Sequence, residues 1–259
     1  MKSLDRKTVL KYIEEHIDEF HKKRETKLYE LDFREVIRHK NPYLFKAKNI
    51  LTAQDLVNGF LTAHLHTQEE TIFGHFLEEL VIFVCGQVFG GKRTDPSLRG
   101  FDLEFERDNI LYVVEIKSSW NWGNSSQLKQ IQINSKNVTE SLAQNRKGIS
   151  EIIAVNGCCF GKRKTAKKSK GYLKLCGQCF WELISGDENL YIDIIEPIGH
   201  KAKDHSISFQ NTYARVLNKF TLEFAKEFCD DGIINWERIV KYVSEKENNI
   251  ERESRMKSC

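Results

Sequence analysis

Three charged residues near the middle of the chain have the types and spacing of a metal-dependent catalytic site. Asp102 lies in one segment of alternating polar and apolar residues, and Glu115 and Lys117 lie in the next. Residues two apart on a strand project from the same face, so Glu115 and Lys117 are expected side by side, with Asp102 reaching them from the neighbouring strand. Buried charge is unfavourable unless it is paired or coordinates a metal ion, which makes these three residues candidate catalytic residues.

The chemistry that these residue types predict is phosphodiester hydrolysis. The carboxylates of Asp102 and Glu115, with the carbonyl of Ile116, form an all-oxygen ligand set that suits Mg²⁺, a hard cation that keeps several waters. The metal would polarise a phosphate, and Lys117 would hold or deprotonate the attacking water. The alternative is a solvated hairpin face with a cross-strand ion pair.

A fourth acidic residue is predicted on the segment that precedes this hairpin. Five apolar residues there form a stripe at helical spacing: Ile72, Phe76, Leu80, Phe83 and Val84. At about 100° per residue, Glu79 falls at the edge of the stripe and Glu78 falls on the opposite side. Glu79 is therefore a candidate catalytic residue and metal ligand, and the alternative is a surface glutamate whose stem covers apolar surface.

Two further stretches have residue types that bind nucleic acid. The segment after Lys117 is rich in aromatic and amide groups, and five of its residues are candidates for phosphate and base contacts: Asn121, Trp122, Asn124, Ser125 and Gln127. The alternative is a capped turn, in which Asn124 or Ser125 caps the following helix. The run KRKTAKKSKG after Gly161 supplies five candidate phosphate contacts: Lys162, Arg163, Lys164, Lys167 and Lys168. Its alternative is a solvated loop.

The elements that must position these residues follow from the spacing of apolar residues. Helical spacing predicts four helices, over 4–28, 53–65, 68–88 and 125–144. Thr52 is a possible cap of the second. Alternation predicts a hairpin of 101–106 with 110–118, and the apolar run EIIAV predicts a buried strand at 151–155. A strand, a helix and a strand in that order favour a parallel pair.

The remaining chain is predicted to be mainly helical. A short helix and a strand are expected over 174–185 and 190–195, one or two helices over 207–247, and a polar tail over 248–259. The predicted fold is a single α/β domain with a mixed central sheet flanked by helices. Its parts are a helical amino-terminal region at 1–66, a catalytic core at 67–200, and carboxyl-terminal helices with a tail at 201–259.

The order of Glu79, Asp102 and Glu115-Ile116-Lys117 resembles the PD-(D/E)XK nuclease superfamily, with Phe101-Asp102 in place of the usual Pro-Asp. Four longer blocks are similar to the PmeII family of type II restriction endonucleases: NPYLFKAKNILTAQDLV at 41–57, EETIFGHFLEE at 69–79, EIKSSWNWGNSSQ at 115–127 and GQCFWELISGD at 177–187. The resemblance implies a PD-(D/E)XK restriction-endonuclease-like core, Mg²⁺-dependent cleavage of double-stranded DNA at a short site, and a homodimer.

The length and composition of the chain limit the other functions that it could have. A chain of 259 residues can bury a substantial core, and its formal net charge of +3 does not by itself argue for nucleic acid. The longest apolar run, LVIFV at 80–84, is too short to span a bilayer, and the first residues lack the apolar region of a secretory signal, so no membrane partner is expected.

Cysteine usage favours a reducing compartment. The chain has seven cysteines and is long enough to fold without disulfides, so a cytoplasmic location is expected. Cys176 and Cys179 form a CxxC downstream of Cys158 and Cys159, but the second CxxC of a matched zinc site is missing.

Two other functions remain open at this point. One is a DNA repair or recombination nuclease with the same core. The other is a DNA-binding protein without catalysis, which would be expected to lack at least one of Asp102, Glu115 and Lys117, whereas all three are present.

Overall fold

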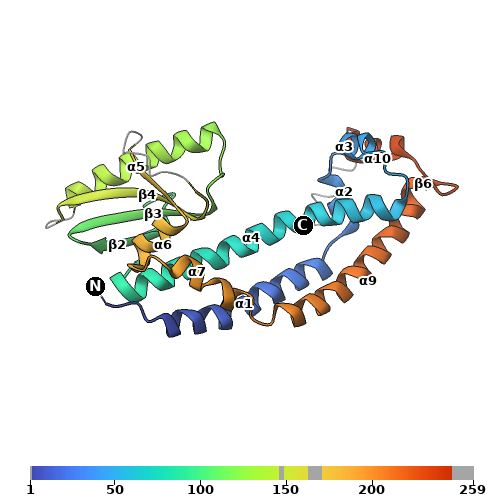
Figure 1. Cartoon of the computed structure of the whole chain (residues 1–259). Coiled ribbons are helices and arrows are strands. Elements are labelled where there is room, and N and C mark those ends of the chain that lie inside the picture. The colour runs from blue at the N-terminus through green and yellow to red at the C-terminus, as the bar shows by residue number, and fades with distance from the viewer. Residues whose placement is uncertain (1, 146–148, 163–170, 247–259) are drawn as a thin grey trace, which may run out of the picture. The chain divides into compact units, whose positions relative to one another are not determined.

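The computed structural model describes residues 2–145, 149–162 and 171–246, and the chain divides into two compact units (Figure 1). The first unit comprises Met1–Phe20 with Thr71–Ala202, and the second comprises His21–Glu70 with Lys203–Cys259. Helices α1 (Arg6–Tyr29) and α4 (Ala53–Phe89) contribute residues to both units. The first 20 residues thus belong with the predicted catalytic core, and most of the predicted helical additions form the second unit.

A five-stranded mixed sheet forms the centre of the first unit. Its strands are β1 (Lys92–Arg93), β2 (Leu103–Arg107), β3 (Ile110–Ser119), β4 (Glu151–Phe160) and β5 (Leu173–Cys176), adjacent in that order. The pairs β1–β2 and β2–β3 are antiparallel, whereas β3–β4 and β4–β5 are parallel. The predicted hairpin and the predicted parallel pair are both confirmed.

The hairpin turn explains why β2 and β3 pair in this register. Its two residues, Asp108 and Asn109, have φ values of 53° and 63°. Two consecutive positive φ angles are typical of the tight turn whose twist matches that of paired strands, and aspartate and asparagine tolerate this conformation well. The turn places Leu103 opposite Val114.

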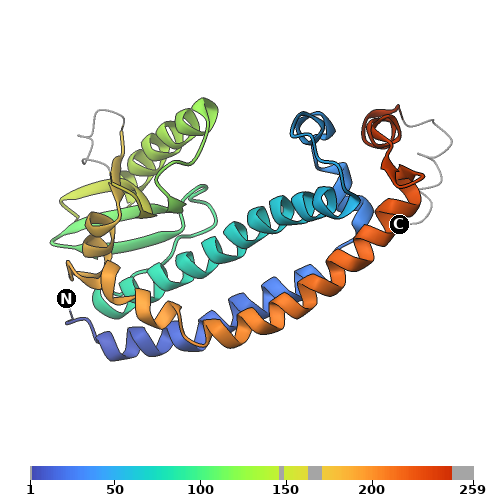
Figure 2. The same cartoon turned by 45° about the vertical axis from the view of Figure 1, so that its right-hand side comes forward.

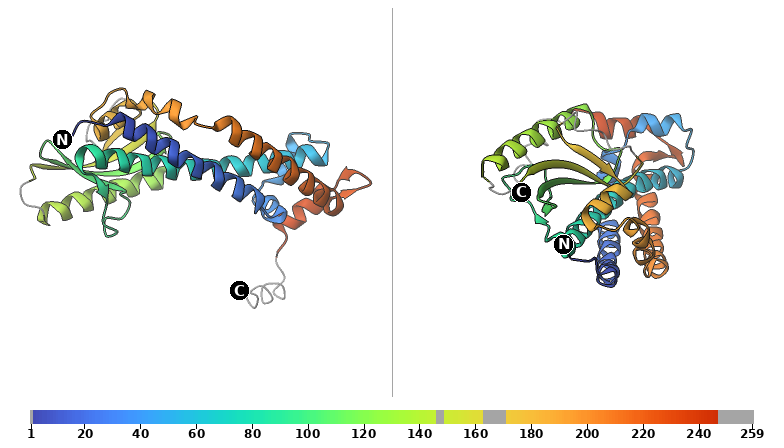
Figure 3. Two further views of the ribbon diagram at one scale, coloured as in Figure 1. Left: turned by 90° about the horizontal axis from the view of Figure 1, so that it is seen from below. Right: turned by 60° about the vertical axis from the view of Figure 1, so that its left-hand side comes forward.

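The two faces of the sheet carry different layers of helices (Figures 1 and 2). Leu111 and Val113 of β3 pack with Ala154 of β4 against α5 (Ser125–Asn145). The intervening residues Val114 and Ile116 face the other way, into a core shared with α1, α4 and α6 (Gln178–Ser185). The same order of α5, sheet and α4 is seen from another side in Figure 3 (right). Strand β3 is therefore apolar on both faces until it reaches Glu115.

The second unit is helical and has an aromatic core. Beyond its parts of α1 and α4 it contains α2 (Phe33–Arg38), α3 (Pro42–Ala47), α9 (Ala202–Phe228) and α10 (Trp236–Ser244), with a small hairpin of β6 (Cys229–Asp230) and β7 (Ile233–Ile234) between the last two. In this core Phe33 contacts three buried rings of α9: Phe220, Phe224 and Phe228. The prediction of one or two helices over 207–247 is confirmed.

Two sequence predictions of individual elements are wrong. The segments 53–65 and 68–88 form one helix, α4, because the polar residues between them include neither glycine nor proline and therefore do not interrupt it. The predicted amino-terminal cap is confirmed, since the Thr52 hydroxyl accepts the Asp55 N–H at 3.1 Å. The predicted strand at 190–195 is also wrong, because this segment forms the short helices α7 (Leu190–Asp193) and α8 (Ile195–Ile198). The strand in this region is β5, which takes the place of the first residues of the helix predicted over 174–185 and pairs with residues 155–158 of β4.

Helix α4 is long and apolar enough to cross a bilayer by length and composition alone. Many of its apolar residues are buried inside the protein. Leu80, Val81 and Val84 are fully buried in the first unit, and Leu56 and Leu61 are fully buried in the second. A helix that contributes to two cores has an apolar surface wider than the single stripe of an ordinary surface helix.

The close packing of β4 predicts opposite effects for two glycine-to-alanine substitutions. A Cβ at Gly157 would lie 2.1 Å from the Phe180 ring, whereas one at Gly74 in α4 would meet nothing within 4 Å. Gly157→Ala is expected to lower the free energy of unfolding by about 1–3 kcal/mol through overpacking. Gly74→Ala is expected to raise it by about 0.5–1 kcal/mol, because glycine is a poor helix former. Urea unfolding measures both changes, and equal effects would contradict the packing described for β4.

Candidate active site

Asp102 is held against β3 by its backbone and by its side chain. Its N–H donates to the Val114 carbonyl at 2.8 Å, and its Oδ2 accepts the Ile116 N–H at 2.7 Å. Among the described residues, Oδ1 accepts no hydrogen bond, so it remains available for a ligand. The carboxylate is thus fixed by backbone atoms on the neighbouring strand.

Glu115 and Lys117 lie on the face of β3 that α5 covers, as the two-residue spacing predicts. Lys117 Nζ lies 2.9 Å from Glu115 Oε1, and the two side chains are 33% and 13% exposed. Asp102 is close enough for its charge to act on Glu115. The structure therefore brings the three predicted residues together, at the point where the apolar side chains of β3 end.

Burial raises the pKa of both carboxyl groups. Desolvation is the main cause at Asp102, and the charge of Glu78 adds to it, whereas the Ile116 N–H and the charges of Lys117 and Arg93 favour the ionised form. Desolvation is also the main cause at Glu115, opposed chiefly by Lys117. Neighbouring positive charges only partly offset the loss of water, so a further cation would be favoured here.

Glu78 is the less exposed of the two neighbouring glutamates of α4, so the predicted placement of Glu78 and Glu79 on the helix is wrong. The Glu78 side chain is 24% exposed and that of Glu79 is 53% exposed. The charge of Glu78 acts on Asp102, whereas that of Glu79 acts on Tyr12. Arg93 of β1 binds both glutamates, with its Nη1 2.9 Å from Glu78 Oε1 and its Nη2 hydrogen-bonded to Glu79 Oε1.

The reason for the wrong placement is the width of the buried face of α4. The predicted stripe omitted four residues that are also buried: Leu77, Val81, Cys85 and Val88. At about 100° per residue these four lie on the side of Glu78, so they move the centre of the buried face toward it. The apolar composition of this part of the chain could have revealed a wider face.

The segment after Lys117 is a capped turn, and one of its aromatic side chains points inward. The Asn124 side chain accepts the N–H groups of Ser126 and Gln127 at 3.0 and 3.1 Å, and the Gln127 side chain accepts the Asn124 N–H at 2.9 Å. The alternative prediction of a capped turn is confirmed for Asn124. The Trp122 indole is partly buried and donates a hydrogen bond to Asn156, whereas Asn121 and Ser125 are exposed.

Two site residues, Asn156 of β4 and Lys174 of β5, were missed by the sequence analysis. Asn156 pairs with Glu115 on one side and with Lys174 on the other, so the three residues form a row across neighbouring strands. Asn156 is fully buried and Lys174 is 7% exposed. A polar residue inside each of the apolar runs EIIAVNGCCF and LKLC was the available signal, because buried polar groups need specific partners.

The basic run after Gly161 is described only at its start. Lys162 is exposed, and the other predicted phosphate contacts, Arg163, Lys164, Lys167 and Lys168, lie outside the described residues.

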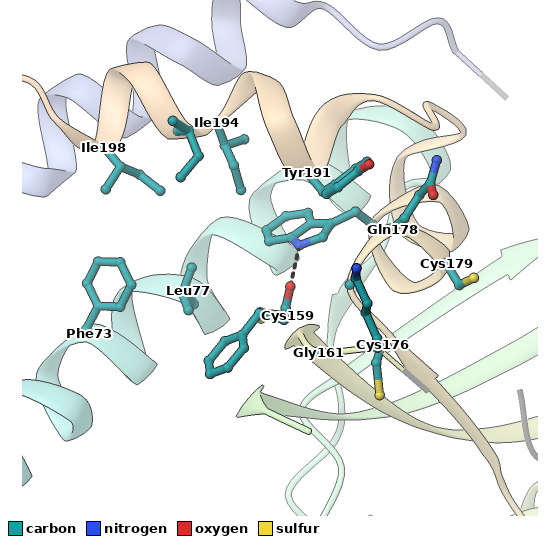
Figure 4. A pocket seen from close by; sticks show the side chains of 15 residues that line it. Phe73, Leu77, Cys159, Gly161, Cys176, Gln178, Cys179, Tyr191, Ile194 and Ile198 are labelled. Atoms are coloured by element: carbon teal, nitrogen blue, oxygen red, sulfur yellow. Dashed lines mark hydrogen bonds between the residues drawn. The ribbon is translucent and has the colours of Figure 1, made fainter. Parts of the chain in front are cut away.

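An apolar pocket of about 940 Å³ lies in the same unit, and neither predicted carboxylate lines it (Figure 4). Trp181 contributes to its wall and donates its indole N–H to the Cys159 carbonyl at 2.9 Å. Cys176 is buried and Cys179 is exposed, and their sulfur atoms point in different directions in Figure 4. In the described part of the chain, no three His, Cys, Asp or Glu side chains form a ready metal-binding group.

A comparison with known protein families identifies the chain. The model of one family, described as type II restriction endonuclease EcoO109I, matches residues 7–206, well over half of the sequence. The chain belongs to the type II restriction endonuclease EcoO109I family. Membership in this family makes it a nuclease of a restriction system with DNA as its substrate. No curated protein is similar enough in sequence to be matched. The family match does not test the resemblance to the PmeII family, which stays a prediction.

The donor atoms fit a hard divalent cation. Asp102, which directly precedes β2, and Glu115 of the adjacent strand β3 supply carboxylate oxygens in a partly dehydrated position. Mg²⁺ is commonly held by one or two carboxylates with several waters, so it does not need a third protein carboxylate in contact with it.

Burial of Asp102 predicts that the metal-free protein is destabilised by this carboxylate at neutral pH. A raised pKa in the folded state contributes stability below the ordinary pKa of 3.8, and this contribution is lost as the pH rises through the folded value. In Asp102→Asn, the amide oxygen can still accept the Ile116 N–H. At pH 7 and in the presence of a chelator, this variant is expected to have a higher melting temperature than the unmodified protein, by about 2–4 °C for each kcal/mol gained in the free energy of unfolding. The difference in melting temperature between Asp102→Asn and the unmodified protein should shrink as the pH falls toward 3.8.

The matched control is Asp95→Asn. The hydrogen bonds from Ser97 lower the pKa of Asp95, so its ionised form is favoured in the folded protein and the variant should not be stabilised at pH 7. Asp102→Asn melting below the unmodified protein at pH 7 would contradict the burial argument.

Proposed function

We propose that this chain is a type II site-specific deoxyribonuclease with a PD-(D/E)XK centre, which uses Mg²⁺ to hydrolyse phosphodiester bonds of double-stranded DNA at a short specific sequence. One observation carries the proposal. Two partly buried carboxylates, Asp102 and Glu115, lie together at the polar end of the otherwise apolar strand β3, with Lys117 Nζ 2.9 Å from Glu115.

In this proposal each residue of the centre has a separate role. Asp102, Glu115 and the carbonyl of Ile116 would hold Mg²⁺, which would supply positive charge to polarise the scissile phosphate and to favour ionisation of a water. The Ile116 N–H keeps the Asp102 carboxylate in place. Lys117, which is 33% exposed, offers its ammonium group to the attacking water and to phosphate oxygens.

The proposal places Glu78 beside the centre and Glu79 at its outer edge. Glu78 is the less exposed of the two and its charge acts on Asp102. Negative charge at this position raises the cation affinity of the site, and Arg93 balances it in the metal-free protein.

DNA contacts are proposed at the exposed positions near the centre. Asn121 and Ser125 border the end of β3, and Lys162 follows β4. Lysine side chains bind phosphates with little regard to sequence, so Lys162→Ala should reduce the salt dependence of DNA binding by up to about one unit of slope. An unchanged slope would remove Lys162 from the proposed interface.

We also propose that the enzyme acts as a homodimer. The residues that the structure describes contain one such centre, and one centre reaches one scissile phosphate at a time. Cleavage of both strands therefore needs two centres, most simply supplied by two copies related by a twofold axis that matches the pseudo-twofold axis of DNA. Sedimentation of the protein alone and with DNA should give a dimer in at least one state. A monomer in both states that only nicks DNA would contradict this proposal.

Digestion of plasmid DNA with Mg²⁺ tests the function and the role of Glu78 together. The unmodified protein should give discrete fragments with identical ends, and Asp102→Ala, Glu115→Ala or Lys117→Ala should fold and bind DNA without cutting it. Glu78→Gln should slow cleavage about 10- to 100-fold, in the range of changes to the surroundings of a metal site. Glu79→Gln is the matched control and should have the smaller effect.

The fragment pattern separates the proposal from the other nuclease function. Discrete bands with a shared sequence at their ends support a restriction endonuclease, and a continuous smear would favour a repair or recombination nuclease. Cleavage by Asp102→Ala at the unmodified rate would show that the centre lies elsewhere.

A further inference from the structure

A row of polar side chains crosses three strands of the sheet beside the proposed centre. Glu115 of β3, Asn156 of β4 and Lys174 of β5 are paired in register. The strand residues next to this row on the same face, Val113 and Ala154, are apolar and buried. Polar groups in such a position are unfavourable unless their hydrogen bonds are satisfied, so their partners indicate what the row does.

Asn156 makes three side-chain hydrogen bonds, and two of them connect Trp122 to Glu115, while the third comes from the Cys158 thiol. The Trp122 indole Nε1 donates to Asn156 Oδ1 at 3.0 Å, and Asn156 Nδ2 donates to Glu115 Oε2 at 3.4 Å. An indole N–H can only donate, so the amide oxygen of Asn156 must face it. The amide NH₂ group must then face Glu115. The hydrogen bond from Trp122 therefore determines that the Asn156 side chain turns its NH₂ group, and not its oxygen, toward Glu115.

The Trp122 ring is itself held in a defined position. Lys117 Nζ lies 4.9 Å and Lys174 Nζ 5.8 Å from its centre, both within reach of a cation–π interaction. Lys174 Nζ also donates to the Trp120 carbonyl at 2.8 Å, which fixes the backbone of the segment that carries Trp122. The aromatic residue is thus a structural part of the centre as well as a neighbour of the DNA-facing segment.

These contacts fix both oxygens of the Glu115 carboxylate. Lys117 lies 2.9 Å from Oε1, and Asn156 holds Oε2. Asn156 is fully buried, so it reaches neither solvent nor DNA and can act only through its neighbours. Groups that hydrogen-bond to metal-binding carboxylates set the direction of the lone pairs offered to the metal.

We propose that Asn156 is a positioning residue for the Glu115 carboxylate, and that Trp122 sets the orientation in which Asn156 presents its amide group. This inference rests on the proposed function, because it assigns Glu115 as a metal ligand.

The test measures binding of Mn²⁺ alone, a divalent ion that suits carboxylate ligands, by the electron paramagnetic resonance signal of the free ion. Asn156→Leu, which keeps the branched shape of the side chain but removes its hydrogen bonds to Trp122 and Glu115, should weaken Mn²⁺ binding about 10- to 100-fold. Trp122→Phe, which keeps a ring between the two ammonium groups, should weaken it in the same direction. Ser135→Ala, a change at another fully buried polar residue of the same unit, is the matched control and should bind as the unmodified protein does.

The double variant distinguishes positioning from a general loss of structure. If Trp122 acts only through Asn156, Trp122→Phe combined with Asn156→Leu should bind Mn²⁺ no more weakly than Asn156→Leu alone, whereas independent structural effects would add. The indole N–H signal of Trp122 in the ¹⁵N NMR spectrum, assigned by its loss in Trp122→Phe, should shift on addition of diamagnetic Mg²⁺ in the unmodified protein and should not shift in Asn156→Leu, where the hydrogen bonds to Glu115 are lost.

Each outcome supports or overturns one part of the proposal about Asn156 and Trp122. Unmodified binding by Asn156→Leu would overturn the positioning role while leaving the proposed function intact, and additive losses in the double variant would overturn the role of Trp122. An unmodified protein that neither binds Mn²⁺ nor cleaves DNA with Mg²⁺ would overturn both the inference and the proposed function. If Asn156→Leu does not fold, Trp122→Phe and the NMR signal still decide, because unchanged Mn²⁺ affinity in Trp122→Phe would contradict the inference.

Discussion

The constraint on which the site depends is the placement of two carboxylates where water is scarce. Asp102 directly precedes β2 and Glu115 lies on the adjacent strand β3, and desolvation raises the pKa of both. A folded protein tolerates such groups only where nearby positive charge or a hydrogen-bond donor compensates for the lost water. Here Lys117, the Ile116 N–H and Arg93 compensate in part, and the remaining cost is what a bound cation would relieve.

The rest of the first unit can be understood as the framework that maintains this arrangement. Strand β3 is covered by α5 on one face and by α1, α4 and α6 on the other, so its position is fixed by packing on both sides. The tight turn at Asp108 and Asn109 sets the register that brings Asp102 beside Glu115. The parallel pairing of β3 with β4 brings Asn156 to Glu115, although the two residues are 41 positions apart in sequence. Membership in the type II restriction endonuclease EcoO109I family places this framework in a nuclease that acts on DNA.

Local patterns in the sequence predicted the parts of the site that depend on neighbouring residues. The two-residue spacing of Glu115 and Lys117, the hairpin that delivers Asp102 and the cap at Asn124 are all consequences of short-range geometry. Glu78 and Asn156 were missed for different reasons. The face of α4 that meets the sheet depends on the full set of its buried residues, and the contact between Asn156 and Glu115 depends on strand register, which a single sequence does not specify.

The central claim is that the two partly buried carboxylates form one divalent-cation site, and diffraction from crystals soaked in Mn²⁺ tests it most directly. The account predicts one anomalous peak per chain, about 2.0–2.3 Å from a carboxylate oxygen of Asp102 and of Glu115, a distance appropriate to small hard cations bound by oxygen. The peak should be absent from crystals of Asp102→Asn soaked in the same way. An unmodified protein with no peak between these residues, or with an equal peak in Asp102→Asn, would contradict the account.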